Sequence, residues 1–123
     1  MDSPHLNRDV LRALQEVMED EYPMLLDIFL ADAEERLVIL RGTQDAAQLM
    51  ETAHSFKGSC SNMGAVRLAE LCNELEQRAK NGRSTEQGEL EKLVHAIGSE
   101  FALVLPLYQA ERSLAGSHIT RSV

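Results

Sequence analysis

Apolar residues recur at spacings of three and four along most of this 123-residue chain. Such spacing gathers side chains on one side of an α-helix, whereas a strand needs strict alternation, and no strand pattern competes here. Short breaks divide the pattern into five segments. We therefore predict helices over residues 8–20, 23–41, 46–62, 65–80 and from about 85 onward.

Four long helices joined by short loops favour antiparallel neighbours. The predicted fold is all-α, an antiparallel up-down four-helix bundle with an additional short N-terminal helix. Asn7 and either Thr43 or Asp45 are suitable N-caps, and Gly42 and Gly64 are suitable helix stops. We assign residues 1–112 to the bundle.

The last segment contains Pro106. Proline lacks an N–H and clashes with the preceding turn, so we expect it to kink or end the helix. From Ser113 the apolar pattern gives way to small and polar residues. We therefore expect residues 113–123 to form a flexible tail.

The composition narrows the possible functions. The chain has no Trp, three Phe and two Tyr, so its core must be aliphatic, and its net charge of −8 disfavours nucleic-acid binding. We find no apolar run near the ~20 residues that span a bilayer and no signal-peptide pattern, so we expect a cytoplasmic protein that does not bind membranes. Cys60 and Cys72 fall on inward stripes, and we expect reduced core thiols and no metal site.

The segment 52–64 carries the most unusual residues. Ala53, Phe56 and Cys60 follow the inward spacing, which turns His54 toward the opposite side of the helix. Lys57, Gly58 and Ser61 share that outward side. A helical glycine costs roughly 0.5–1 kcal/mol relative to alanine, so Gly58 requires another explanation.

These residues resemble the signature of histidine phosphotransfer (HPt) domains of two-component phosphorelays. The likeness runs from Ala53 to Glu76, and the five-helix layout extends it over most of the chain, as in free-standing phosphotransfer proteins. It consists of Ala-His-Ser-Phe-Lys-Gly at 53–58, Ser-Asn-Met-Gly-Ala at 61–65, Leu-Ala-Glu-Leu-Cys at 68–72 and Leu-Glu at 75–76.

The resemblance implies that His54 is the phosphoacceptor. It would take a phosphoryl group from the aspartyl phosphate of a receiver domain in a hybrid sensor kinase and pass it to a response regulator. Lys57 would offset phosphoryl charge, and Gly58 would leave space for the receiver. The receiver would bring Mg²⁺. The chain itself would need no cofactor, because it lacks any phosphate-binding fingerprint for ATP.

Further residues are candidates around His54. Glu76 on the next helix is our first choice to hold one imidazole nitrogen, with Gln77 as the alternative. Ser61 is a candidate contact to the phosphate. Met50, one turn before His54, suits an apolar docking patch that Leu26 or Ile28 would extend.

Two other functions remain possible from the sequence. A helical module could bind a partner without any chemistry at His54, and a sensor-kinase dimerisation bundle would have similar helices. The kinase interpretation is weaker because no ATP-binding region follows. We expect a monomer that contacts receiver domains.

Overall fold

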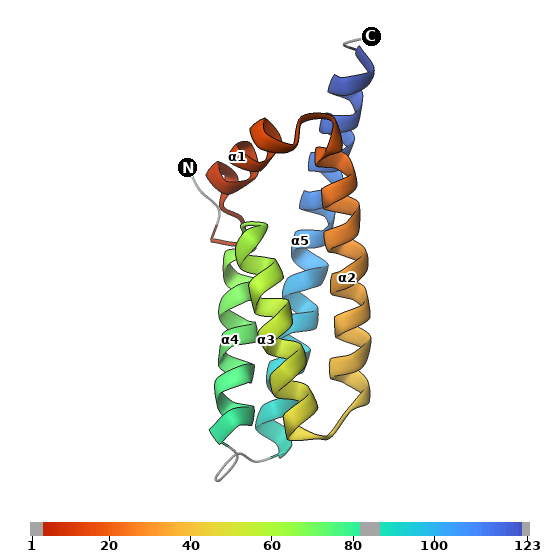
Figure 1. Ribbon diagram of the computed structural model, residues 1–123. Coiled ribbons are helices and arrows are strands. Elements are labelled where there is room, and N and C mark those ends of the chain that lie inside the picture. The colour runs from red at the N-terminus through yellow and green to blue at the C-terminus, as the bar shows by residue number, and fades with distance from the viewer. Residues whose placement is uncertain (1–3, 82–86, 122–123) are drawn as a thin grey trace.

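The computed structural model describes residues 4–81 and 87–121, and side chains up to residue 115 (Figure 1). Four helices stand side by side as an antiparallel bundle, and a short helix, α1, lies across one end. The predicted all-α fold and its additional N-terminal helix are therefore confirmed. The helices are α1 (Arg8–Met18), α2 (Tyr22–Gly42), α3 (Ala46–Asn62), α4 (Val66–Asn81) and α5 (Gln87–Arg121), with a 3-10 turn at Glu19–Glu21.

Polar side chains begin two of these helices as predicted. Asn7 Oδ1 accepts hydrogen bonds from the backbone N–H groups of Asp9 and Val10, which start α1. Asp45 Oδ1 accepts from Ala47 N–H at 3.2 Å and is the N-cap of α3. This contact decides between Thr43 and Asp45 in favour of the aspartate.

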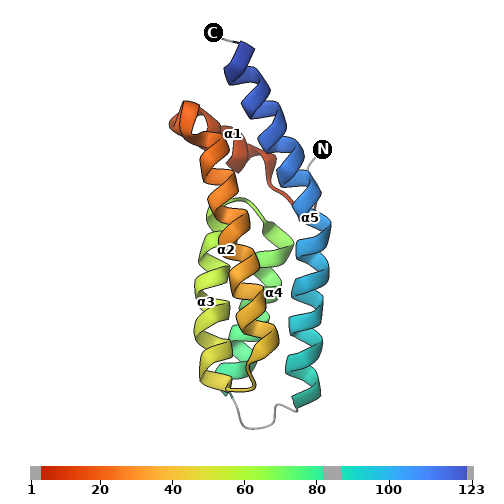
Figure 2. The same cartoon turned by 90° about the vertical axis from the view of Figure 1, so that its right-hand side faces the viewer.

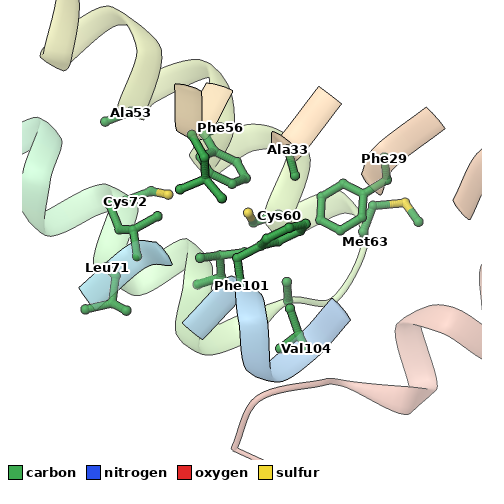
Figure 3. Packing of buried hydrophobic residues seen from close by; sticks show 14 of the residues in the cluster. Phe29, Ala33, Ala53, Phe56, Cys60, Met63, Leu71, Cys72, Phe101 and Val104 are labelled. Carbon is green, nitrogen blue, oxygen red and sulfur yellow. The ribbon is translucent and has the colours of Figure 1, made fainter. Parts of the chain in front are cut away.

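The core is built mainly from the inward stripes of α2 to α5, and Leu6 and Leu11 join it from the N-terminal segment and α1 (Figure 3). Phe29 and Tyr108 pack with ring centroids 5.1 Å apart. Cys60 and Cys72 are free and buried, as predicted. A hydrogen bond from Cys72 and burial both raise the pKa of the Cys60 thiol, which makes it a poor nucleophile.

Helix α5 is longer than the sequence suggested. Of the two outcomes expected at Pro106, a kink or an end, the end is wrong, because the helix continues to Arg121, past the other helices (Figure 2). Residues 113–121, which we expected to form a tail, are helical, while 122 and 123 lie outside the described residues. Val104 and Tyr108 are fully buried on either side of the proline and hold the helix on the core.

Contacts distant in sequence stabilise α5 around residues 111–115. Arg112 Nε donates to both carboxylate oxygens of Asp27 at 3.2 Å. Tyr22 Oη donates to Glu111 at 3.1 Å, and Ala115 is only 3% exposed. These partners lie far away in sequence, so the local composition does not reveal the contacts that lead into the segment expected to be a tail.

The N-terminal segment is bound to the turn that follows α3. Leu6 and Ala65 form an isolated antiparallel bridge, and Asn7 N–H donates to the carbonyl of Gly64 at 2.8 Å. From α5, Tyr108 Oη donates to the carbonyl of Met63 at 2.7 Å. Gly64 has φ of +74°, so it stops α3 in a conformation that favours glycine.

Among the described residues, one segment is long and apolar enough by length and composition to cross a membrane, Gly88–Ala115. It is the larger part of α5. Its stripe of Val94, Ile97, Phe101 and Val104 packs in the bundle core, and this packing accounts for its apolar composition.

Candidate functional site

His54 lies in the middle of α3 with its side chain 68% exposed. The orientation follows from the opposite face of the helix, where Ala53, Phe56 and Cys60 are fully buried. Their burial fixes the rotation of α3 and turns position 54 to solvent. The predicted outward placement of the imidazole is confirmed.

Glu76 on α4 contacts His54 across the helix pair. Its Oε2 is 2.8 Å from His54 Nδ1, and its side chain is only 12% exposed. Gln77, the alternative, is exposed to solvent. The structure thus selects Glu76 as the neighbour of the imidazole.

Lys57 binds the other oxygen of the same carboxylate. Its Nζ is 2.7 Å from Glu76 Oε1 and donates to Asn73 Oδ1 at 3.3 Å. The Lys57 ammonium, and after it the hydrogen bond from His54, hold the pKa of Glu76 below its usual value despite burial. Glu76 is therefore ionised at neutral pH.

The ionised state of Glu76 determines the tautomer of His54. A carboxylate has no proton to donate, so the Nδ1–H of His54 must be the donor in the 2.8 Å contact. In the neutral ring, Nε2 then carries the lone pair. A neutral imidazole with a free, exposed nitrogen can act as a nucleophile.

The remaining predicted residues differ in their surroundings. A Cβ placed on Gly58 would have no heavy atom within 4 Å, and Ser61 is exposed on the same helix. Met50 is half-buried and packs against the core, so it is less exposed than we expected. Leu26 is fully buried, which rules it out as a docking residue, whereas Ile28 is 52% exposed.

A groove of about 370 Å³ runs along α3 and α4 beside the imidazole. It is lined by Met50, Glu51, His54, Glu76 and Lys80. The sequence interpretation missed Lys80 and Asn73, although both follow helical spacing from Glu76, at one turn after and one turn before. This spacing from Glu76 is the sequence signal that could have identified both residues.

Arg36 is another neighbour that the sequence did not indicate. Its Nη2 and Nε donate to Ser55 Oγ at 2.9 and 3.2 Å, which joins α2 to α3 beside the nucleophile. No local pattern relates positions 19 residues apart. Within the part of the chain that is described, no group of three His, Cys, Asp or Glu side chains could hold a metal ion.

Comparison with known proteins identifies the family. The family model of the Hpt domain matches residues 24–102. The phosphorelay protein LuxU of Vibrio harveyi is 34% identical over 92 residues, covering 72% of this chain and 81% of that protein. LuxU of Vibrio vulnificus strain YJ016 is 30% identical over 86 residues, covering 67% and 75%.

A solved structure is also similar. The crystal structure of histidine-containing phosphotransfer protein B (HptB) from Pseudomonas aeruginosa PAO1 matches with a TM-score of 0.85 and 50% identity. The match covers 91% of this chain and 97% of that one. The chain therefore belongs to the Hpt domain family and is a histidine phosphotransfer protein of phosphorelays.

Proposed function

We propose that His54 is the phosphoacceptor of this protein. It takes the phosphoryl group from an aspartyl phosphate on the receiver domain of a hybrid sensor kinase and gives it to a receiver aspartate of a response regulator. The observation that carries the proposal is the exposed imidazole whose Nδ1 is held 2.8 Å from the Glu76 carboxylate. That contact directs Nε2 to solvent.

The transfer needs no proton to leave the site. The Nε2 lone pair of His54 attacks phosphorus, the P–O bond to the donor aspartate breaks, and the aspartate leaves as a carboxylate. The ring then carries positive charge with its Nδ1–H still bound to Glu76, whose negative charge stabilises it. Transfer to the second aspartate reverses these bond changes.

Lys57 and Gly58 support this step in different ways. Lys57 holds Glu76 in position through the 2.7 Å ion pair, and the same pair offsets much of the positive charge that its ammonium brings near the phosphoryl oxygens. Gly58 leaves open space on the exposed face of α3, where a receiver would approach. Ser61, Met50 and Ile28 are candidate contacts to the receiver.

The protein is in this proposal a carrier rather than an enzyme. It binds no ATP and no cofactor of its own, and the Mg²⁺ that assists phosphoryl transfer is held by the receiver. We also propose that it acts as a cytoplasmic monomer, without nucleic acid or membrane as a partner.

The test uses a receiver domain that carries a ³²P-labelled aspartyl phosphate. We expect the wild type to take up label that is acid-labile and alkali-stable, and His54→Gln to take up none. His95→Gln, which changes an exposed histidine on α5, is the matched control and should keep the label.

Two results would contradict the proposal. Label on His54→Gln would place the acceptor elsewhere. Absence of label on the wild type, with a donor shown to be competent, would favour a binding module without chemistry. Circular dichroism of both variants verifies that the bundle is intact.

A further inference from the structure

We propose that the groove beside His54 is a phosphoryl subsite in which Lys80 supplies the positive charge and Glu51 opposes it. This inference rests on the proposed phosphorylation of His54 and adds to it. It gives roles to two residues that the family resemblance did not single out. Its basis is the arrangement of charges that line the groove.

Lys57 is already engaged before any phosphoryl group arrives. Its ammonium lies 2.7 Å from Glu76 Oε1 and 3.3 Å from Asn73 Oδ1, and its side chain is 28% exposed. The partner carboxylate balances its charge. The Lys57–Glu76 pair therefore adds little net positive field at the outer nitrogen of His54.

Lys80 lines the same groove without being part of that pair. It lies one helical turn after Glu76 on α4 and is exposed. Of the five residues that line the groove, Lys80 is the one basic side chain besides the His54 imidazole itself, while Glu51 and Glu76 are acidic. Its four-carbon stem lets the ammonium follow a group that is added at the mouth.

A phosphoryl group adds close to two negative charges at neutral pH. In the groove these charges are attracted by Lys80 and repelled by Glu51, which lies one turn before His54 on α3. The cation favours the dianionic phosphoryl group, and the carboxylate favours the monoanion. Lys80 therefore lowers the second pKa of the phosphoryl group, and Glu51 raises it.

The probe is phosphoramidate, a small donor that needs no receiver domain. Nε2 of His54 attacks its phosphorus, the P–N bond breaks, and ammonia leaves. The ³¹P NMR shift of the phosphohistidine is then followed against pH in the full chain. We expect Lys80→Gln to raise the phosphoryl pKa by about 0.5, and Glu51→Gln to lower it by a similar amount.

Two variants control this experiment. Lys92→Gln makes the same change of net charge at an exposed position on α5, outside the groove, and should titrate as the wild type does. Lys80→Arg keeps the cation and should also retain the wild-type titration. A purely structural role of Lys80 in the last turn of α4 would alter unfolding without moving the phosphoryl pKa.

The outcomes are distinct. If the phosphoryl pKa is the same in Lys80→Gln and Lys92→Gln, the subsite is overturned, because any shift then comes from the change in net charge alone. A phosphoryl pKa that shifts in the same direction in Lys80→Gln and in Glu51→Gln overturns it as well. A ³¹P signal that persists in His54→Gln, or that is absent from the wild type, overturns the proposed function and the subsite with it.

Discussion

The residue that links nucleophile and cation is Glu76. One of its oxygens faces His54 and the other faces Lys57, and its side chain is 12% exposed. A buried acid with two such partners gains more from ionisation than it loses through burial, as the lowered pKa shows. Its charge therefore contributes to the stability of the fold as well as to the site.

This link predicts a pH dependence of stability. Glu76 titrates below the ordinary value of 4.5 in the folded chain and near that value when unfolded. Its contribution is complete above the unfolded pKa and is lost as pH falls through the folded pKa. The difference in unfolding free energy between wild type and Glu76→Gln should be largest at neutral pH and should shrink in acid.

Urea denaturation at a series of pH values measures that difference. Glu70→Gln removes a carboxylate that is 62% exposed on the same helix, and it serves as the control with a small effect at every pH. A stability difference for Glu76→Gln that stays constant, or widens in acid, would show that the carboxylate is not held in its ionised form.

At the scale of whole helices, α5 contains a residue that helices rarely tolerate. Pro106 is exposed inside α5 and has no N–H for the preceding turn. The helix continues because tertiary contacts on both sides outweigh the lost hydrogen bond. A residue that restores this hydrogen bond should therefore raise the free energy of unfolding.

We predict that Pro106→Ala raises the unfolding free energy by about 1–3 kcal/mol, since alanine restores the hydrogen bond and removes the clash. Thermal and urea unfolding measure the change. Gln109→Ala exchanges two good helix formers at a nearby exposed position and should have little effect. A loss of stability in Pro106→Ala would mean that the proline shapes α5 in a way the core requires.

Helices with local signals were predictable within one or two residues. Asp45 and Gly64 delimit α3, which spans Ala46–Asn62 as predicted. The continuation of α5 beyond Ser113 was not predictable, because the contacts that lead into it join Glu111 and Arg112 to Tyr22 and Asp27, which are about 85 to 90 residues away in sequence. The helical pattern is local, whereas the ends of an unusual helix depend on the folded neighbours.

At the scale of the whole molecule, the N-terminal segment, the turn after α3 and α5 meet at one end of the bundle. His5 Nδ1 lies 2.6 Å from Glu100, a buried carboxylate of α5, and the carbonyl of His5 accepts from Val66 N–H. Gly64 lies at the centre of this junction. A Cβ there would come within 2.8 Å of the Asn7 carbonyl.

We predict that Gly64→Ala destabilises the protein by about 1–3 kcal/mol, because alanine disfavours the positive φ and would press on the Asn7 backbone. Gly58→Ala is the matched comparison. It adds the same methyl group to open space inside a helix and should stabilise by about 0.5–1 kcal/mol. Urea unfolding compares the two, and effects of the same sign would contradict the prediction.

The site was predictable only in part for the same reason. The pattern of inward residues places His54 outside, and the family resemblance directs attention to Glu76. The contacts of Lys57 with Asn73 and of Arg36 with Ser55 depend on how the helices align, which no single segment encodes. A sequence indicates the faces of helices better than it indicates which side chains meet across them.

The contacts of His54 and Lys57 with Glu76 and Asn73 all belong to the hairpin of α3 and α4. Ile28, an exposed apolar residue on the neighbouring α2, has no part in them. A substitution at Ile28 therefore leaves the contacts of the reactive hairpin in place.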